Sequence, residues 1–329
     1  MANPSLSSYF SLKPENEQLT RVHANLLQWY AAEHRDLPWR FTRNPYAILV
    51  SEIMLQQTQV LRVLPKFEQF MAAFPTLADL AAASTADVIS VWVPLGYNMR
   101  AIRIQSIARQ VMKEYGGCLP NSIEELLKLK GIGRYTAGAI VCFAFKKQVA
   151  MVDTNIHRVL HRIFLGPELS EPGLTNDQML TFAEQVLPDG KAYDWNQALM
   201  DLGATICTNS NPQCSRCPLR DACKTYSEMS QYSLFPSGTV LRQLRKVAEK
   251  KEPYQNQPFT NTNRYFRGRI VDHLCSLPEG QRVPLTLLGP KIKREFREDD
   301  LIWLQQLVEK LSKDGLVDYA DEGVRLPSS

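Results

Sequence analysis

The sequence predicts an all-α fold followed by a small C-terminal module, and three observations support this prediction. Apolar residues recur at helical spacing from Leu19 onward, Gly or Pro interrupts most gaps between the periodic segments, and no segment alternates convincingly with period two. The 329 residues, 44% hydrophobic and 22% charged, have an ordinary globular composition and allow two or three domains. This composition excludes a disordered chain.

The predicted α-helical domain covers residues 18–226 and follows a polar tail at 1–17 that we expect to be frayed. Its first helix begins with the apolar stripe that starts at Leu19. Further helical segments are expected at 45–74, 76–83, 86–95, 99–115, 122–129, 136–145 and 154–164. A polar cysteine loop at 207–223 closes the domain.

A polar linker at 227–262 separates this domain from a C-terminal domain at 263–329. The linker contains a basic stretch at 242–251, for which a solvated tail is the simplest interpretation. In the C-terminal domain we expect two helices and then two short strands, at 267–277, 299–315, 316–320 and 323–327. Helices that end in a two-stranded wing are typical of a winged-helix module.

The start of the chain and its charge bear on localisation and partners. No charged and apolar leader pattern opens the sequence, and no apolar run approaches the ~20 residues that span a bilayer. We therefore expect no membrane partner and a cytoplasmic, nucleoid-associated protein. The net charge of +4 permits a polyanionic partner. A monomer is expected.

Four cysteines, Cys207, Cys214, Cys217 and Cys223, follow the spacing C-x6-C-x2-C-x5-C. Thiolates bind iron-sulfur clusters or zinc. Zinc modules more often show two C-x2-C pairs with a longer insert, whereas three unequal short spacings suit one loop around a cubane cluster. The spacing favours a [4Fe-4S] cluster, and zinc or a chance group of thiols are the alternatives.

The segment KGIGRY contains a short turn with Gly131 and Gly133 between two predicted helices. Glycines there expose backbone N–H groups, and such groups at a helix N-terminus bind phosphate. A glycine C-cap between two packed helices is the structural alternative.

Two carboxylates stand in contrasting surroundings. Glu52 is flanked by apolar residues on both sides, so we expect partial burial, a raised pKa and a proton donor. Asp153 is placed like the N-cap of a helix, whose amides and dipole favour the ionised form. One protonated and one charged carboxylate is the division of labour in glycosidic bond cleavage. A solvated helix face for Glu52 and a plain N-cap for Asp153 are the alternatives.

Seven motifs resemble the MutY-type A/G-specific adenine DNA glycosylases of the helix-hairpin-helix, endonuclease-III-like superfamily. These are LPWR at 37–40, SEIMLQQTQV at 51–60, LGYNMRA at 95–101, GIGRYTAGAI at 131–140, VDTNIHRV at 152–159, NQALMDLGATIC at 196–207 and the cysteine loop. The resemblance covers roughly residues 20–226. It implies a two-lobed helical glycosylase with the active site in the cleft between the lobes.

The resemblance implies roles for individual residues. Glu52 would protonate adenine, and Asp153 would stabilise the oxocarbenium ion at C1′, through a covalent stage or without one. Asn155 and Tyr135 would assist. The KGIGRY turn would grip DNA phosphates with Gly131, Gly133 and Arg134. Residues that fill the gap or touch the opposite 8-oxoguanine would be Gln57, Thr58, Leu95 and Tyr97, with Arg40 near the adenine pocket.

Tyr135 stands where strand-nicking members of the superfamily use a lysine, so the resemblance implies a monofunctional enzyme. Its partner would be double-stranded DNA with mismatched or oxidised base pairs. The chain departs from the family pattern at Asn98, commonly Tyr, and at Lys130, commonly Pro. The C-terminal region does not look like the MutT-like domain of many members. Two alternatives follow: a thymine or uracil glycosylase for T/G or U/G mismatches, and a non-catalytic iron-sulfur DNA-binding protein.

Overall fold

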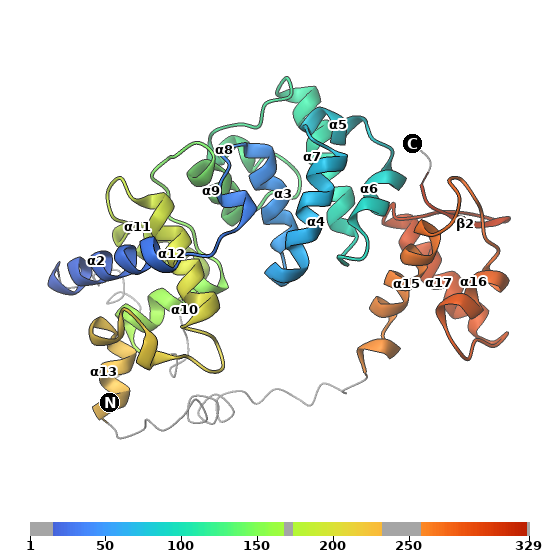
Figure 1. The fold of residues 1–329 in the computed structure, drawn as a ribbon. Coiled ribbons are helices and arrows are strands. Elements are labelled where there is room, and N and C mark those ends of the chain that lie inside the picture. The colour runs from blue at the N-terminus through green and yellow to red at the C-terminus, as the bar shows by residue number, and fades with distance from the viewer. Residues whose placement is uncertain (1–15, 168–173, 232–257, 328–329) are drawn as a thin grey trace. The chain divides into compact units, whose positions relative to one another are not determined.

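The computed structural model describes residues 16–167, 174–231 and 258–327. These residues belong to two compact units (Figure 1). Unit 1 combines the N-terminal helix with the chain from Gly138 onward, and unit 2 combines residues 37–137 with the C-terminal residues from Pro253. Most of the predicted tail and the basic stretch at 242–251 lie outside the described residues.

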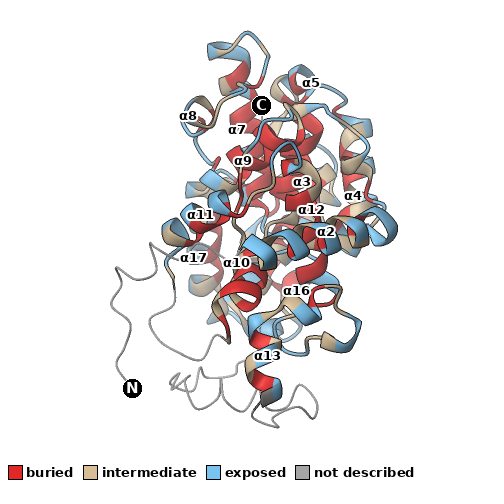
Figure 2. Ribbon diagram, turned by 90° about the vertical axis from the view of Figure 1, so that its left-hand side faces the viewer, coloured by how far each residue is buried: buried red, intermediate tan, exposed pale blue. Residues whose placement is uncertain are grey.

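Unit 1 is helical, and its principal core residues come from α2, α10 and α12. Its elements are α2 (Asn16–Glu33), the second half of α9 (Arg134–Phe143), α10 (Thr154–Leu160), the π-helical turn η2 (His161–Leu165), α11 (Asn176–Gln185), α12 (Ala192–Thr205), the short turns η3 (Cys214–Arg216) and η4 (Arg220–Ala222), and α13 (Lys224–Gln231). Figure 2 shows the exposed outer face of α2. Its inner face buries Val22, Leu26 and Tyr30. The apolar stripe predicted from Leu19 onward is therefore a helix.

Helix α12 is the centre of unit 1, and the sequence analysis did not identify it as a helix. Its buried face includes polar side chains, which obscure the apolar periodicity. Asp201 is fully buried and accepts hydrogen bonds from the backbone N–H and the Nε of Arg35, at 3.1 and 2.7 Å. Asn196 donates to the carbonyl of Val149 at 2.9 Å. Each buried polar group thus has a partner, as burial requires.

The first part of unit 2 is also helical. In chain order its elements are η1 (Pro38–Arg40), α3 (Pro45–Leu55), α4 (Val60–Ala73), α5 (Leu77–Ala82), α6 (Thr85–Trp92), α7 (Met99–Glu114), α8 (Ile123–Leu126) and the first half of α9. The continuous helix expected at 45–74 is wrong, since a turn at 56–59 divides it into α3 and α4. Gln57 in this turn has φ +54°, which no α-helix accommodates.

The C-terminal part of unit 2 has a third helix that the sequence analysis missed. Its elements are η5 (Phe259–Asn261), α15 (Asn263–Cys275), α16 (Leu285–Ile292), α17 (Asp300–Lys313), β1 (Asp318–Ala320) and β2 (Gly323–Arg325). The strands are antiparallel, and an isolated bridge joins Val283 to Val324. The missed helix α16 contains Gly289 and Pro290, which weaken helical propensity.

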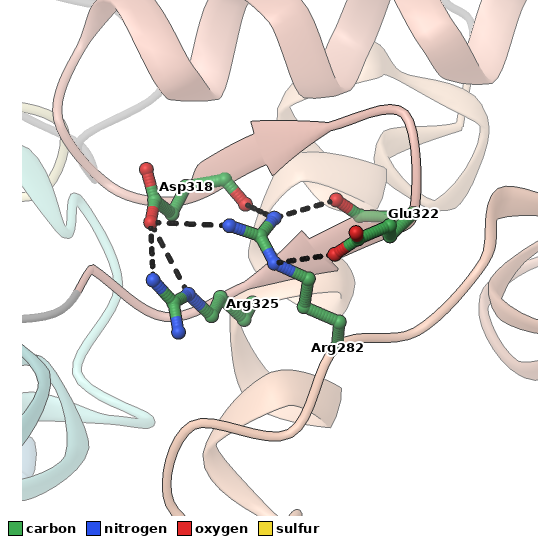
Figure 3. Close-up of polar contacts among 5 residues, drawn as sticks. Arg282, Asp318, Glu322 and Arg325 are labelled. Carbon is green, nitrogen blue, oxygen red and sulfur yellow. Dashed lines mark hydrogen bonds and ion pairs between the residues drawn. The ribbon is translucent and has the colours of Figure 1, made fainter.

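A charged cluster holds the hairpin (Figure 3). The carboxylate of Asp318 accepts hydrogen bonds from Arg325 Nε and Nη2 at 3.2 and 3.0 Å. Arg282 Nη2 lies 3.5 Å from the same carboxylate, and Arg282 Nη1 donates to the carbonyl of Gly323 at 3.0 Å. Arg282 thereby ties the segment before α16 to both strands.

The predicted all-α fold class is confirmed, with two short strands as its β-structure among the described residues. No helix in the described part of the chain is long and apolar enough to cross a membrane. The domain boundaries proposed from the sequence remain predictions.

Candidate active site

Glu52 lies in the interior of α3, a helix that is buried from Tyr46 to Met54. Helix α3 begins at Pro45, because Asn44 caps it by accepting the N–H of Tyr46 at 2.9 Å and proline is favoured at the first helical position. Glu52 itself is 7% exposed. This burial excludes the solvated-face interpretation. Burial disfavours an ionised carboxylate, so the position suits a proton donor.

Two turns in unit 2 hold non-glycine residues in the left-handed region. Gln57 lies between α3 and α4 with φ +54°, and Tyr97 lies between α6 and α7 with φ +51°. This conformation is uncommon for such residues and is often found at functional sites. Both residues were predicted to contact DNA. The side chain of Tyr97 is 38% exposed and therefore accessible.

Arg100 joins these two turns, and the sequence analysis did not single it out. It is 5% exposed. Its Nη1 donates to three carbonyl groups at the end of α3, at distances of 2.5 to 3.1 Å. Its Nη2 donates to the carbonyl of Gly96 and to Thr58 Oγ1, both at 3.0 Å. Burial lowers the pKa of Arg100 to about 10. Through the hydrogen bond that it accepts from Arg100, Thr58 stabilises the turn between α3 and α4.

Leu95 and Arg40 differ from the other predicted contact residues. Leu95 is 3% exposed, so its side chain packs inside unit 2. Arg40 is the last residue of η1. The preceding residue, Trp39, is buried, and its ring makes an edge contact with Phe67 at a centroid distance of 5.3 Å, which anchors η1. The Arg40 side chain is half-buried.

The KGIGRY turn leads into α9. Gly131 has φ +106°, and a Cβ there would lie 2.6 Å from the Arg103 side chain, so the turn requires glycine. Gly133 has no heavy atom within 4 Å of a Cβ position, which leaves its surroundings open. The first helical hydrogen bond joins Ala137 N to Gly133 O at 2.9 Å, so the amides of Arg134 and Tyr135 lie outside the helical ladder. This geometry is compatible with phosphate binding.

In unit 1, Asp153 is the N-cap of α10. Its Oδ1 accepts the N–H of Ile156 at 2.7 Å, and its Oδ2 accepts Asn155 Nδ2 at 3.2 Å. These groups and nearby Arg158 lower the pKa of Asp153, but burial has the larger effect and raises the pKa above the usual 3.8. The N–H groups expected from the sequence are present, but the effect of burial on the pKa of Asp153 is larger than expected.

Arg158 continues this arrangement, and it too was missed. Its Nη2 donates to Asn155 Oδ1 and to the carbonyl of Gly203, both at 2.8 Å. Its Nε donates to the carbonyl of Cys207 at 2.9 Å. Gly203 permits this packing, because a Cβ there would lie 2.8 Å from the Cβ of Asn155. A chain of contacts therefore connects Asp153 to the start of the cysteine loop.

The four cysteines of the loop line one small cavity, which Arg162 also borders. Arg162 Nη1 lies 3.6 Å from Cys207 Sγ, and Cys223 Sγ donates to the Arg162 carbonyl at 3.3 Å. Burial, with a smaller effect of the neighbouring sulfurs, raises the pKa of both Cys217 and Cys223 to about 12.

All seven cysteines are free thiols. Among the described residues no three His, Cys, Asp or Glu side chains are grouped tightly enough to hold a single metal ion. A single zinc ion would need its sulfurs about 2.3 Å from one point. Four cysteine sulfurs around one cavity form a donor set that suits a thiolate-bound metal centre.

The predicted site residues therefore fall into two groups. Unit 2 carries one set, which is Arg40, Glu52, Gln57, Thr58, Leu95, Tyr97, Gly131, Gly133, Arg134 and Tyr135. Unit 1 carries the other, which is Asp153, Asn155 and the four cysteines. Each unit thus contributes one of the two carboxylates.

Known proteins similar to this chain include curated adenine DNA glycosylases. Residues 50–185 match the family model described as HhH-GPD superfamily base excision DNA repair protein. The adenine DNA glycosylase of Homo sapiens is 42% identical over 246 residues, covering 72% of this chain and 45% of that protein. The chain thus spans about half the length of the mammalian relatives it matches. The adenine DNA glycosylase of Mycolicibacterium smegmatis is 36% identical over 305 residues, covering 91% of this chain and 93% of that protein.

Two solved structures are similar to this chain in fold. A thermostable thymine-DNA glycosylase is 33% identical with a TM-score of 0.61, covering 65% of this chain and 98% of that one. An endonuclease III trapped as a covalent DNA intermediate is 22% identical with a TM-score of 0.57, covering 66% of this chain and 100% of that one, and supports the fold alone. The likeness over nearly the whole mycobacterial protein decides the family: the chain belongs to the adenine DNA glycosylases of the HhH-GPD superfamily.

Proposed function

We propose that this protein is a monofunctional DNA glycosylase of base excision repair that removes adenine mispaired with 8-oxoguanine or guanine. The observation that carries the proposal is the carboxylate of Asp153, half-buried and oriented by Ile156 and Asn155, in a chain of the adenine glycosylase family. A plain N-cap needs only the first of these two contacts. The second orients the free oxygen of the carboxylate.

The reaction begins with a target adenine turned out of the duplex, because its glycosidic bond is otherwise inaccessible. Glu52 donates a proton to the base, and the C1′–N bond breaks with its electron pair moving to adenine. Asp153 stabilises the positive charge that develops at C1′. Water then adds at C1′, and the proton that it gives up restores the acid form of Glu52, directly or through solvent. A covalent stage with Asp153 is an alternative course of the second step.

The product follows from Tyr135. A phenol cannot form the Schiff base by which a lysine would nick the strand, so an abasic site is left. Asn155 and Arg158 keep the Asp153 carboxylate in position through their hydrogen bonds. Tyr135 lies in the first turn of α9, beside Arg134 and the glycines that are proposed to bind DNA phosphates.

Recognition of the base pair is assigned to the two left-handed turns. Gln57 and the exposed ring of Tyr97 would meet the base opposite adenine, and Arg40 would border the adenine pocket. Thr58 and Leu95 would contribute through the backbone they support, since Thr58 is bonded to Arg100 and Leu95 is buried.

We further propose that Cys207, Cys214, Cys217 and Cys223 hold a [4Fe-4S] cluster. The group would supply a covalent cross-link among four points of a loop that has short helical turns and little core of its own. The hydrogen bond from Arg158 to the carbonyl of Cys207 would connect the loop to α10, and the contact between Arg162 and Cys207 would connect it to η2.

Other features complete the proposal. Double-stranded DNA with mismatched or oxidised base pairs is the expected partner, and the protein is expected to act as a monomer in the cytoplasm, associated with the nucleoid. The C-terminal part, with three helices and an antiparallel hairpin, supports assignment to the winged-helix class.

A thymine or uracil glycosylase is the second candidate. It is favoured by the 33% identity to a thermostable thymine-DNA glycosylase. The 36% to 42% identity to curated adenine DNA glycosylases favours adenine. The third alternative, a non-catalytic DNA-binding protein, has no use for a buried Glu52 or an oriented Asp153.

Single-turnover base excision tests these candidates side by side. The substrates are duplexes with adenine opposite 8-oxoguanine, A/G, T/G and U/G. The proposal requires adenine to leave faster than thymine or uracil, and strand nicking to require added alkali. Faster loss of thymine or uracil would replace the adenine assignment, and loss of no base would leave a DNA-binding protein.

A further inference from the structure

A basic hollow of about 640 Å³ lies within unit 2. One wall comes from the residues around the Tyr97 turn, and the other comes from η5, α15 and α17 of the C-terminal part. The lining includes one carboxylate, Asp272, and six arginines, which are Arg62, Arg100, Arg103, Arg264, Arg267 and Arg269. Such an excess of positive charge around a concave surface attracts a polyanion.

Most of these arginines are held by protein groups. Arg267 forms an ion pair with Asp314, and Arg269 donates to the carbonyl of Lys291 at 2.9 Å. Arg62 donates to the carbonyl of Pro94 at 3.0 Å. These contacts fix the basic wall and leave the guanidinium groups positively charged.

Arg264 is different. Its guanidinium lies 3.8 Å from the centre of the Tyr97 ring and 5.9 Å from that of Phe259. It has neither a hydrogen bond nor an ion pair with any of the residues that the structure describes, and its side chain is exposed. A cation above an aromatic face gains about 0.5–1 kcal/mol at an exposed site. Phosphate contacts that replace or supplement this interaction would add two charge-assisted hydrogen bonds.

We propose that this hollow extends the DNA-binding surface, in that Arg264 of α15 binds the phosphodiester backbone beside the base pair that Tyr97 meets. The inference rests on the proposed function, because it requires DNA at Tyr97. The C-terminal part thereby acts at the site of base-pair recognition, where it binds the phosphodiester backbone of the DNA. Arg264 supplies a guanidinium group whose hydrogen-bond donors are not used by the described residues.

The alternative is a purely structural role, in which Arg264 only packs α15 against Tyr97. The two roles differ in the salt dependence of DNA binding. Each phosphate contact contributes about 0.9 to the slope of log affinity against log salt concentration. A packing contact contributes to the thermal stability instead.

The test measures the dissociation constant of a short duplex with 8-oxoguanine opposite 2′-fluoro-2′-deoxyadenosine, whose glycosidic bond resists cleavage, over a series of salt concentrations. We expect Arg264→Ala to weaken binding about fivefold to tenfold at low salt and to reduce the slope by about 1. Arg264→Lys should retain most of the slope, because it keeps the charge. The matched control is Arg294→Ala, an exposed arginine of the same C-terminal part that does not line the hollow.

An unchanged slope in Arg264→Ala overturns the proposal, as does an equal reduction in Arg294→Ala. If the alanine variant melts below the parent, Arg264→Gln, which retains a planar polar group, takes its place under the same criteria. Base excision by the parent protein is measured separately. Failure of excision with a reduced slope would reject the proposed function and keep the DNA site.

Discussion

Glu52 is a buried carboxylate and Asp153 a half-buried one, and the two units hold them in different ways. In unit 2, Glu52 lies within a helix that is buried almost throughout, and burial raises the free-energy cost of ionising a carboxylate. In unit 1, Asp153 lies at the start of a helix and accepts two hydrogen bonds, from Ile156 and Asn155. The first setting favours a proton donor, and the second fixes the direction of a carboxylate.

The supporting arginines differ in the same way. Arg100 binds backbone carbonyls and a hydroxyl, and thereby shapes two turns. Arg158 binds the side chain of Asn155, which in turn binds Asp153. Arg100 therefore supports the fold of a recognition surface, whereas Arg158 supports both the backbone near α12 and the side chain that orients Asp153. Substitution of Arg100 should therefore act on folding, whereas substitution of Arg158 should also affect the excision rate.

The largest expected effect is that of Glu52→Gln. We expect the single-turnover rate of adenine excision to fall by at least ~10²-fold, because the acid is lost while the shape of the side chain is kept. The matched control is Glu68→Gln, which alters an exposed glutamate of α4 in the same unit. An unimpaired rate in a folded Glu52→Gln variant would remove Glu52 from the mechanism.

Arg100→Ala should reduce the free energy of unfolding by about 3 kcal/mol. The variant leaves several carbonyl groups of two turns without their donor, and each buried unsatisfied group costs about 1–3 kcal/mol before relaxation. Denaturant unfolding measures the loss. Arg109→Ala on the same helix is the control, since Arg109 also donates to carbonyl groups but is exposed. Equal losses in the two variants would contradict the role assigned to Arg100.

Gly203→Ala sharpens the comparison from the side of unit 1. The added methyl group would lie 2.8 Å from Asn155 Cβ and 3.2 Å from Val159 Cγ2, so α10 must shift from α12. Overpacking of this kind costs about 1–3 kcal/mol, and we expect a slower excision rate because Asn155 moves with α10. Gly133→Ala, where a Cβ meets no atom within 4 Å, should keep the parent's melting temperature. A normal rate for Gly203→Ala would separate Asn155 from catalysis.

The smallest effect concerns the stability of Asp153→Asn at different pH values. Because burial raises the pKa of Asp153 above 3.8, the folded protein holds this proton to a higher pH than the unfolded chain. As pH rises from 3.8 through the folded-state pKa, ionisation of Asp153 lowers the free energy of unfolding. At any pH above the folded-state pKa the full loss is present.

Asn is an equally good N-cap, so Asp153→Asn removes this cost and keeps the cap. Its urea midpoint should exceed that of the parent at neutral pH, and the difference should shrink toward about pH 4. A variant that is less stable than the parent at neutral pH would show that the hydrogen bonds outweigh burial.

The sequence was sufficient for features that depend on neighbouring residues. The apolar flanks of Glu52 predicted its burial, and the position of Asp153 before a periodic stripe predicted its role as an N-cap. Contacts over long sequence separations were not accessible in this way. Arg100 binds groups up to 47 residues away, and Arg158 binds groups up to 49 away.

Local patterns also failed where polar side chains are buried. The buried face of α12 contains Asn196 and Asp201, so an apolar stripe did not identify this helix. The turn at Gln57 was missed because no Gly or Pro marks it, and the conformation there is maintained by Arg100 from α7. The left-handed conformation of Gln57 thus depends on tertiary contacts and not on the local sequence.

The most direct test of the account is the excision rate of Asp153→Asn on a duplex with adenine opposite 8-oxoguanine. Since Asn keeps the helix cap and loses only the charge, the account predicts at least ~10²-fold slower single-turnover excision, with DNA affinity and a neutral-pH melting temperature at or above those of the parent. Asp189→Asn, which alters an exposed carboxylate of unit 1, should match the parent. Excision by Asp153→Asn at the parent's rate would show that Asp153 only caps α10, and would contradict the mechanism.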